Sequence, residues 1–218
     1  MGQTVAVIPA RNESATVGAV VYAALDARLV DAVVVVDNAS TDGTAAVAAA
    51  HGARVVQAPI PGKGEALRAG VAAAGAASVL VFLDADLVGL RPGHVDRLAA
   101  AVVSGEADMA CGMFDRGPVV NRLLRAALPV LTGQRALRRE LFDRLHEDDV
   151  RGWRVEAALN SLVAQQGLAR RVEVLPGLWH RTKEEKLATP ALGHATKLAM
   201  LASACWGYVR FGLRLYPS

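Results

Sequence analysis

The stretch VLVFLDADLVGLRP, residues 79–92, joins five consecutive apolar residues to two carboxylates one residue apart. An apolar run without polar alternation favours a strand that is covered on both faces. Asp84 and Asp86 follow this run, and residues two apart in an extended chain point the same way, so their like charges would repel each other. The stretch therefore predicts a buried strand that ends in a cation-binding pair of carboxylates.

The rest of the chain alternates similar short apolar runs with segments rich in helix formers. Strand-like runs cover residues 4–10, 31–40, 53–59, 78–86, 107–114 and 170–177. Helices are expected over 14–28, 42–51, 63–75, 92–104, 119–128, 134–145 and 153–166, with Ser14, Thr41 or Asp42 as N-caps and Pro92 in a first turn. This order predicts an α/β protein, a single domain with a Rossmann-like, mostly parallel central sheet flanked by helices.

Composition narrows the class of protein. The chain has 218 residues, of which 53% are hydrophobic and 21% charged, as in a globular protein with one large core. Cys111 and Cys205 lack metal-ligand spacing and are interpreted as small buried hydrophobes. The net charge of +3 comes without a dense basic stripe, so we expect an acidic small molecule or an anionic membrane surface rather than nucleic acid as partner. The start, MGQTVAVIPARNES, lacks the pattern of a signal peptide, so we expect a cytoplasmic location.

Polar residues gather where three of the expected strands end. They are residues 9–13, Asp37 with Asn38, and Asp84 with Asp86. In an open parallel sheet these ends meet at one edge, where ligands bind. A single Asp at a strand end can instead cap a helix, so the pair carries more weight than Asp37 alone. Mg²⁺ or Mn²⁺ would suit the two carboxylates and would neutralise a diphosphate.

Two familiar nucleotide-binding motifs are missing from the sequence. There is no Walker A sequence and no GxGxxG, which argues against a P-loop and a dinucleotide cofactor. The segment PGKGEALRAG, residues 61–70, is a Gly/Lys loop that opens a helix and could contact phosphate without matching either motif.

Four segments in this order and spacing resemble the family 2 glycosyltransferases of GT-A fold: VAVIPARNES (5–14), VVVVDNASTDGT (33–44), GKGEALRAG (62–70) and VLVFLDADL (79–87). The likeness is to the short, soluble branch with polyprenyl-phosphate sugar synthases and glucosyl-phosphoglycerate synthase-like enzymes. It continues through TGQRALRRELF (132–142) and residues 152–186. The resemblance implies a domain over 1–186, with a nucleotide-binding half (1–115) and an acceptor half (116–186), followed by a C-terminal helical tail (187–218).

The resemblance also implies a metal-dependent transfer of a sugar from a nucleotide-diphosphate donor, with UDP favoured and GDP next. The nucleotide sugar would contact Pro9, Ala10, Arg11, Glu13, Asp37, Asn38, Lys63, Asp84 and Ala85. Asp86 would bind Mg²⁺ or Mn²⁺ directly with His180 as a further ligand, and Asp84 would reach the ribose or the same ion. Asn38 stands where many relatives have Asp, which leaves the identity of the nucleotide's base open.

The acceptor side is implied by the same resemblance. Glu156, in GWRVEAALN, is the candidate catalytic base, and Asp84 is the second candidate catalytic residue. The run Glu147–Asp149 is the competing choice for the base, or else it forms an acidic turn. Arg135, Arg181 and Lys183 would contact the leaving diphosphate or a phosphate-bearing acceptor, small or lipid-linked. A phosphate acceptor is already anionic, in which case Glu156 would orient a sugar hydroxyl. Family 2 members invert configuration, whereas related phosphoglycerate glucosyltransferases retain it.

The tail and two rival functions stay open. Residues 192–218 are apolar but interrupted by basic residues, so they fit a peripheral membrane contact, packing on the domain, or a homodimer contact.

A nucleotidyltransferase would need a Gly-rich basic loop where PARNESATVG (9–18) stands. A catalytically silent GT-A binding subunit is disfavoured by the intact carboxylates and His180, and metal-dependent donor hydrolysis would separate it from an enzyme.

Overall fold

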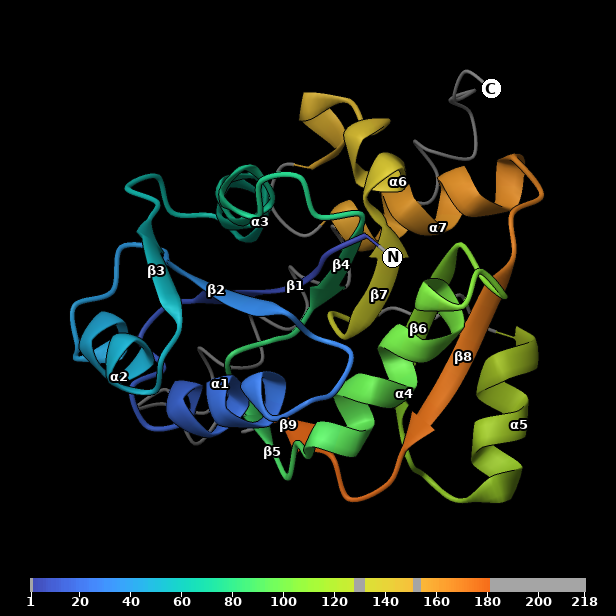
Figure 1. Ribbon diagram of the computed structural model, residues 1–218. Helices are drawn as coiled ribbons and strands as arrows, with labels where there is room; N and C mark the ends of the chain where they lie inside the picture. Colours follow the sequence, from blue (N-terminus) through green and yellow to red (C-terminus); the bar gives the residue numbers. More distant parts are fainter. Residues whose placement is uncertain (1, 128–131, 151–153, 181–218) are drawn as a thin grey trace, which may run out of the picture.

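A seven-stranded sheet in the order β3-β2-β1-β4-β7-β6-β8 organises the fold (Figure 1). The computed structural model describes residues 2–127, 132–150 and 154–180. The strands are β1 (Thr4–Ala10), β2 (Ala32–Asp37), β3 (Arg54–Gln57), β4 (Val79–Phe82), β6 (Met109–Phe114), β7 (Arg135–Arg138) and β8 (Arg170–Leu175). Two short strands, β5 (Leu87–Val88) and β9 (Trp179–His180), pair with each other in a second sheet.

Helices cover both faces of the large sheet (Figure 1). On one face lie α3 (Lys63–Ala73), α6 (Arg139–Asp143) and α7 (Val155–Gln165), and on the other lie α1 (Val17–Leu25), α2 (Thr44–Ala50) and α4 (Pro92–Val103). The last helix, α5 (Pro118–Ala127), follows β6, and a 3₁₀ helix, η1, spans Glu147–Asp149. The predicted GT-A fold, with its mostly parallel sheet between helices, is confirmed.

Alternation along each strand divides the core into two layers. In β1, Val5 and Val7 belong to the layer under α3 and α7, whereas Ala6 and Ile8 belong to the layer under α1 and α4. The same division holds in β2 and β4. Because apolar side chains fill both faces, these strands read as continuous rather than alternating hydrophobic runs.

The segment 134–145, predicted as one helix, begins instead as a strand. β7 lies between β4 and β6 and runs antiparallel to both. Ala136 and Leu137 are fully buried, one in each core layer, and α6 begins only at Arg139. The helical prediction was wrong because pairing with two neighbouring strands outweighs the helix propensity of a short Leu- and Arg-containing segment.

The predicted helix starts were partly right. Pro92 is the first residue of α4, as expected. Helix α1 begins after Thr16, so the N-cap predicted at Ser14 was wrong. Helix α2 begins after Gly43, although Asp42 Oδ1 accepts a 3.0 Å hydrogen bond from the amide of Thr44 and so binds its first turn. Within the described residues, no helix has the length and apolar character that crossing a membrane requires.

The order of the strands reverses beside β1. The chain moves outward from β1 through β2 to β3, then returns to the opposite side of β1 with β4. Loops that leave β1 and β4 therefore separate at their carboxyl ends, which is the position where open α/β sheets bind ligands. All three polar clusters found in the sequence follow strands at this edge.

Candidate active site

Two carboxylates and an imidazole converge at the carboxyl end of β4. Asp84 and Asp86 follow this strand, and His180 ends β9, whose pairing with β5 places it opposite Leu87. One ligand atom from each of the three side chains lies within 4.8 Å of the others. Carboxylate oxygens and an imidazole nitrogen are suitable ligands for Mn²⁺, so the cluster could hold a divalent ion.

His180 is held between Asp86 and an aromatic ring. Its Nδ1 lies 3.0 Å from Asp86 Oδ1, and its ring meets Phe114 edge to face with centroids 4.7 Å apart. Burial and the positive charge of Lys63 work to lower the pKa of His180, but the hydrogen bond to Asp86 and the charges of Asp84 and Asp86 raise it overall. The same two carboxylates that could hold an ion therefore raise the pKa of His180.

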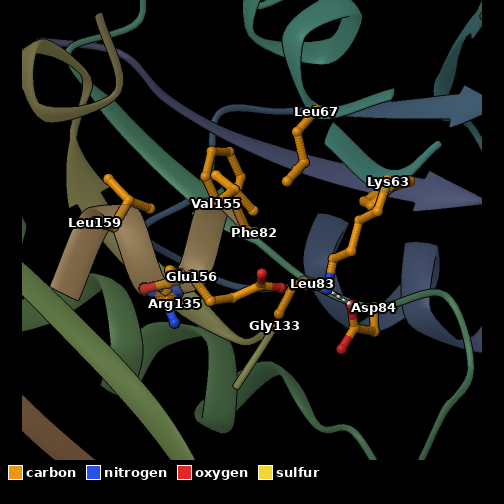
Figure 2. Close-up of a pocket in the computed structure, with 11 residues that line it drawn as sticks. Lys63, Leu67, Phe82, Leu83, Asp84, Gly133, Arg135, Val155, Glu156 and Leu159 are labelled. Atoms are coloured by element: carbon orange, nitrogen blue, oxygen red, sulfur yellow. Dashed lines mark hydrogen bonds and ion pairs between the residues drawn. The ribbon is translucent and has the colours of Figure 1, made fainter. Parts of the chain in front are cut away.

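Lys63 joins Asp84 to Glu156. It is the first residue of α3, and its Nζ lies 2.9 Å from Asp84 Oδ1 and 2.7 Å from Glu156 Oε1. Figure 2 shows Lys63 and Glu156 reaching toward Asp84 from α3 and α7. Burial opposes the charged ammonium, but the two carboxylates outweigh it and raise the pKa of Lys63. Lys63 is thus a fixed cation between two anions.

A small cavity lies beside the ion pairs that Lys63 forms with Asp84 and Glu156 (Figure 2). Its volume is about 10 Å³, room for a single water molecule. Polar lining comes from Lys63, Asp84, Arg135 and Glu156, and the remaining lining is formed by Pro9, Leu67, Phe82, Leu83, Gly133, Val155 and Leu159. Glu156, at the first turn of α7, is only 7% exposed. The cavity brings together residues from β1, α3, β4, β7 and α7.

The loops after β1 and β2 are tied to each other by hydrogen bonds. Asn12 Oδ1 accepts a 2.8 Å hydrogen bond from the amide of Thr41, and the amide of Glu13 donates to Thr44 Oγ1 at 2.8 Å. Partial burial works to raise the pKa of Asp42, but hydrogen bonds from Thr44 and Ser14 lower it to about 2. This network holds the two loops in a defined arrangement.

Two residues in these loops adopt backbone angles that are unusual for them. Asn12 and Ala39 both have φ of 56°. Asn tolerates this left-handed region, but an alanine there costs about 1–2 kcal/mol. Such strain is common in loops that are shaped for ligand contact.

Asp37 and Asn38 are both nearly buried and differ in what they contact. Asp37 Oδ1 accepts a hydrogen bond of 3.3 Å from the amide of Ser40. Asn38 donates to the carbonyls of Ala58 and Ile60, and its Oδ1 accepts a 2.7 Å hydrogen bond from the amide of Gly62. Asn38 therefore fixes the loop that delivers Lys63.

The remaining predicted site residues are distributed differently. Arg11 is exposed beside the β1 loop, Pro9 lines the cavity, and Ala10 and Ala85 are buried. Arg135 is 1% exposed, and its Nε and Nη2 donate to the carbonyl of Thr132 at 3.1 and 2.7 Å. Arg181 and Lys183 lie outside the described residues.

The competing acidic run forms the 3₁₀ helix η1, away from the cavity lining. Glu147 is paired with Arg68 at 2.7 Å and is mostly exposed. Asp148 is exposed, whereas Asp149 is fully buried. Glu156, by contrast, faces Lys63.

Sequence reasoning missed the turn that precedes β7. Gln134 Nε2 donates a 2.7 Å hydrogen bond to Asp84 Oδ2, and an added Cβ at Gly133 would lie 2.2 Å from the same oxygen. Residues 134–145 were interpreted as one helix, which hid the position of Gln134 beside β4. Only a prediction of β7 as a strand would have placed Gln134 next to Asp84.

Comparison with known proteins finds a matching family and similar enzymes. The sequence model of glycosyl transferase family 2 matches residues 5–154. Glucosyl-3-phosphoglycerate synthase of Mycobacterium tuberculosis H37Rv is 39% identical over 129 residues, which cover 54% of this chain and 40% of that protein. An uncharacterized glycosyltransferase of the same strain is 45% identical over 106 residues, covering 49% of this chain and 46% of that protein. These matches span less than half the length of the curated relatives.

Similar crystal structures extend the likeness over nearly the whole chain. The M. tuberculosis glucosyl-3-phosphoglycerate synthase in complex with phosphoglyceric acid has a TM-score of 0.77 and 30% identity, covering 98% of this chain and 81% of that chain. The same enzyme with Mn²⁺, UDP and glucosyl-3-phosphoglycerate has a TM-score of 0.74 and 30% identity, covering 93% and 78%. The shared fold is thus that of glycosyltransferases that bind Mn²⁺ and a UDP sugar.

Proposed function

This chain belongs to glycosyl transferase family 2, and from that membership we propose that it transfers a sugar from a UDP-sugar to a small, phosphate-bearing acceptor with a divalent ion bound. The observation that carries the proposal is the convergence of Asp84, Asp86 and His180 beside the Lys63–Glu156 pair. Mn²⁺ in crystals of the similar mycobacterial enzyme supports the choice of ion, and its UDP-glucose complex supports the donor. A bound ion would stabilise negative charge on the leaving diphosphate.

The donor would occupy the crevice between the β1 and β4 loops. We assign Asp86 and His180 to the ion, and Asp84 to the ribose or the same ion. Support comes from the like-charged pair itself, because a cation beside two converging carboxylates offsets their mutual repulsion. The other proposed donor contacts are Pro9, Ala10, Arg11, Glu13, Asp37, Asn38, Lys63 and Ala85.

Lys63 and Glu156 would act where the sugar is transferred. Lys63 holds Glu156 Oε1 at 2.7 Å, so this carboxylate has a fixed orientation toward the site. From that position it would take the proton of a hydroxyl acceptor or orient a hydroxyl of the donor sugar. The ammonium of Lys63 would also face negative charge as the diphosphate departs.

The proposal for the acceptor rests on what a similar enzyme binds and on two basic residues of this chain. The similar mycobacterial enzyme binds phosphoglyceric acid, a small phosphate-bearing molecule. Arg181 and Lys183 are the proposed phosphate contacts, and GDP-sugars and lipid-linked phosphates are the next donor and acceptor to test. Cytoplasmic location, peripheral membrane contact and dimer formation stay predictions, because the membrane and dimer arguments concern residues 187–218, outside the described residues.

Thermal unfolding with a panel of nucleotide sugars tests the donor. A ligand that binds only the folded chain raises the melting temperature, and a ligand at about 100 times its Kd adds about 2.7 kcal/mol. We expect a rise with UDP-glucose or another UDP-sugar that requires Mn²⁺, and a smaller rise with GDP-sugars. No Mn²⁺-dependent rise with any sugar nucleotide would contradict the proposal and favour a silent GT-A subunit.

Metal affinity is expected to depend on pH through His180. Its pKa is raised above the ordinary 6.5, and only the neutral imidazole can bind an ion. Mn²⁺ must therefore displace a proton, so affinity should fall by up to about tenfold per pH unit below the raised pKa. Stability of the metal-free protein should show the opposite sign, because the charged His180 stabilises fully below pH 6.5 and that contribution is lost as pH rises through the raised pKa.

Mn²⁺ titrations followed by electron paramagnetic resonance, from about pH 5.5 to 8.5, would measure this dependence. In His180→Asn the affinity should be lower and its pH dependence shallower. His51→Asn is a matched control, because His51 is exposed at the C-terminal end of α2 with its Nδ1 at the carbonyl of Val47. An unchanged slope in His180→Asn would remove His180 from the proposed ligands.

A further inference from the structure

The carboxylate of Asp84 is held from two sides. Lys63 contacts its Oδ1 at 2.9 Å, and Gln134 Nε2 donates to its Oδ2 at 2.7 Å. Lys63 belongs to the donor site already described. Gln134 belongs to the turn before β7, has no role in the proposed reaction and is 1% exposed. Its burial beside a carboxylate calls for a physical explanation.

The orientation of the Gln134 amide follows from its partners. An ionised carboxylate only accepts hydrogen bonds, so the NH₂ group of Gln134 must face Asp84. The opposite end, Oε1, then accepts a 2.5 Å hydrogen bond from Thr132 Oγ1. A three-membered relay runs from Thr132 through Gln134 to Asp84.

The backbone around Gln134 is fixed as well. Its carbonyl accepts a 2.8 Å hydrogen bond from the amide of Gly112 in β6, and its amide donates to Thr132 Oγ1 at 3.2 Å. Arg135 binds the carbonyl of Thr132 through Nε and Nη2, and its Nη1 lies 3.5 Å from the carbonyl of Glu156. Hydrogen bonds thereby link the turn to β6 and to the first turn of α7.

Gly133 allows the turn to approach Asp84. An added Cβ would lie 2.2 Å from Asp84 Oδ2 and 2.4 Å from Oδ1. Any other residue at this position would therefore displace the carboxylate. The chain brings its backbone against Asp84 at the same place where Gln134 donates its hydrogen bond.

We propose that Gln134 is a positioning residue, which sets the orientation of the Asp84 carboxylate for the ion and donor while Thr132 sets the orientation of Gln134. The inference rests on the proposed metal-dependent donor site. A carboxylate has about four acceptor positions, so the hydrogen bonds from Lys63 and Gln134 leave further lone pairs available to an ion or a ribose hydroxyl. Hydrogen bonds to the groups that surround an ion orient them and contribute to its affinity.

The test compares Mn²⁺ binding by the full chain and by Gln134→Leu, which keeps the size of the side chain and removes its amide. We expect the Kd for Mn²⁺, measured by electron paramagnetic resonance with UDP absent and present, to rise about 10–100-fold. The melting temperature without metal should change little. Gln165→Leu, an exposed position near the end of α7, is the matched control and should bind Mn²⁺ like the parent.

Thr132→Val gives an independent measurement, because it keeps the β-branched shape and removes only the hydroxyl. Its Kd should rise about 2–10-fold, the effect of one hydrogen bond. The double variant should bind no more weakly than Gln134→Leu alone, because both changes break one relay. If Gln134→Leu does not fold, Thr132→Val decides by itself.

Three outcomes are distinguishable. Parental Mn²⁺ affinity in folded Gln134→Leu, or strictly additive losses in the double variant, would overturn the positioning role and leave the proposed function intact. A parent chain that binds no Mn²⁺ with or without UDP would instead contradict the proposed function. Weakened binding in both single variants without additivity would support the relay.

Discussion

Replacing Asp86 by alanine is expected to abolish Mn²⁺-dependent UDP binding and to lower sugar transfer by about 10³-fold or more. A metal ion contributes several kcal/mol of charge stabilisation in a transfer reaction, and each 1.36 kcal/mol corresponds to a factor of ten in rate. Asp86 is a proposed ligand and also the partner of His180 Nδ1 at 3.0 Å. Its removal therefore takes away one ligand and frees another.

The melting temperature separates this effect from misfolding. Without metal, Asp86→Ala should unfold near the parental temperature, because removing a negative charge beside Asp84 offsets the loss of the hydrogen bond to His180. Addition of Mn²⁺ and UDP should then produce no rise. Asp143→Ala, at an exposed ion pair with Arg139 on α6, is the control. Undiminished transfer in Asp86→Ala would remove this residue from the metal site.

Replacing Glu156 by glutamine is expected to lower transfer by about 10²–10⁴-fold, the usual contribution of a general base, with donor affinity changed little. Glutamine is nearly isosteric, and its side-chain oxygen can still accept a hydrogen bond from Lys63, which lies 2.7 Å from Glu156 Oε1. The donor side of the site should therefore keep its geometry, while the group at the acceptor side loses its charge.

Single-turnover transfer and UDP binding should be measured on the same sample. Glu106→Gln is the matched control, because Glu106 is exposed and pairs with Arg171 far along the sheet. A parallel loss of donor binding in Glu156→Gln would indicate a role in holding Lys63 rather than in the reaction. Near-parental transfer would contradict the assignment and direct the search to Asp148 or Asp149.

The sequence determined the features that depend on local pattern. Strands β1, β2, β4 and β6 were predictable, because burial on both faces requires uninterrupted apolar runs. The closeness of Asp84 and Asp86 was also expected, although the strand predicted to reach Asp86 ends at Phe82. Their position at the carboxyl ends of parallel strands then followed from the fold class.

The tertiary structure alone decided which distant groups meet. β7 forms because β4 and β6 offer hydrogen-bonding edges on both sides, which no local propensity of residues 135–138 records. Its insertion brings Gln134 to Asp84 across 50 positions of sequence, and the position of α3 and α7 on the same face of the sheet brings Lys63 to Glu156. Such contacts depend on strand order, register and helix packing, so a pattern read along the chain identifies the carboxylates but not the side chains that hold them.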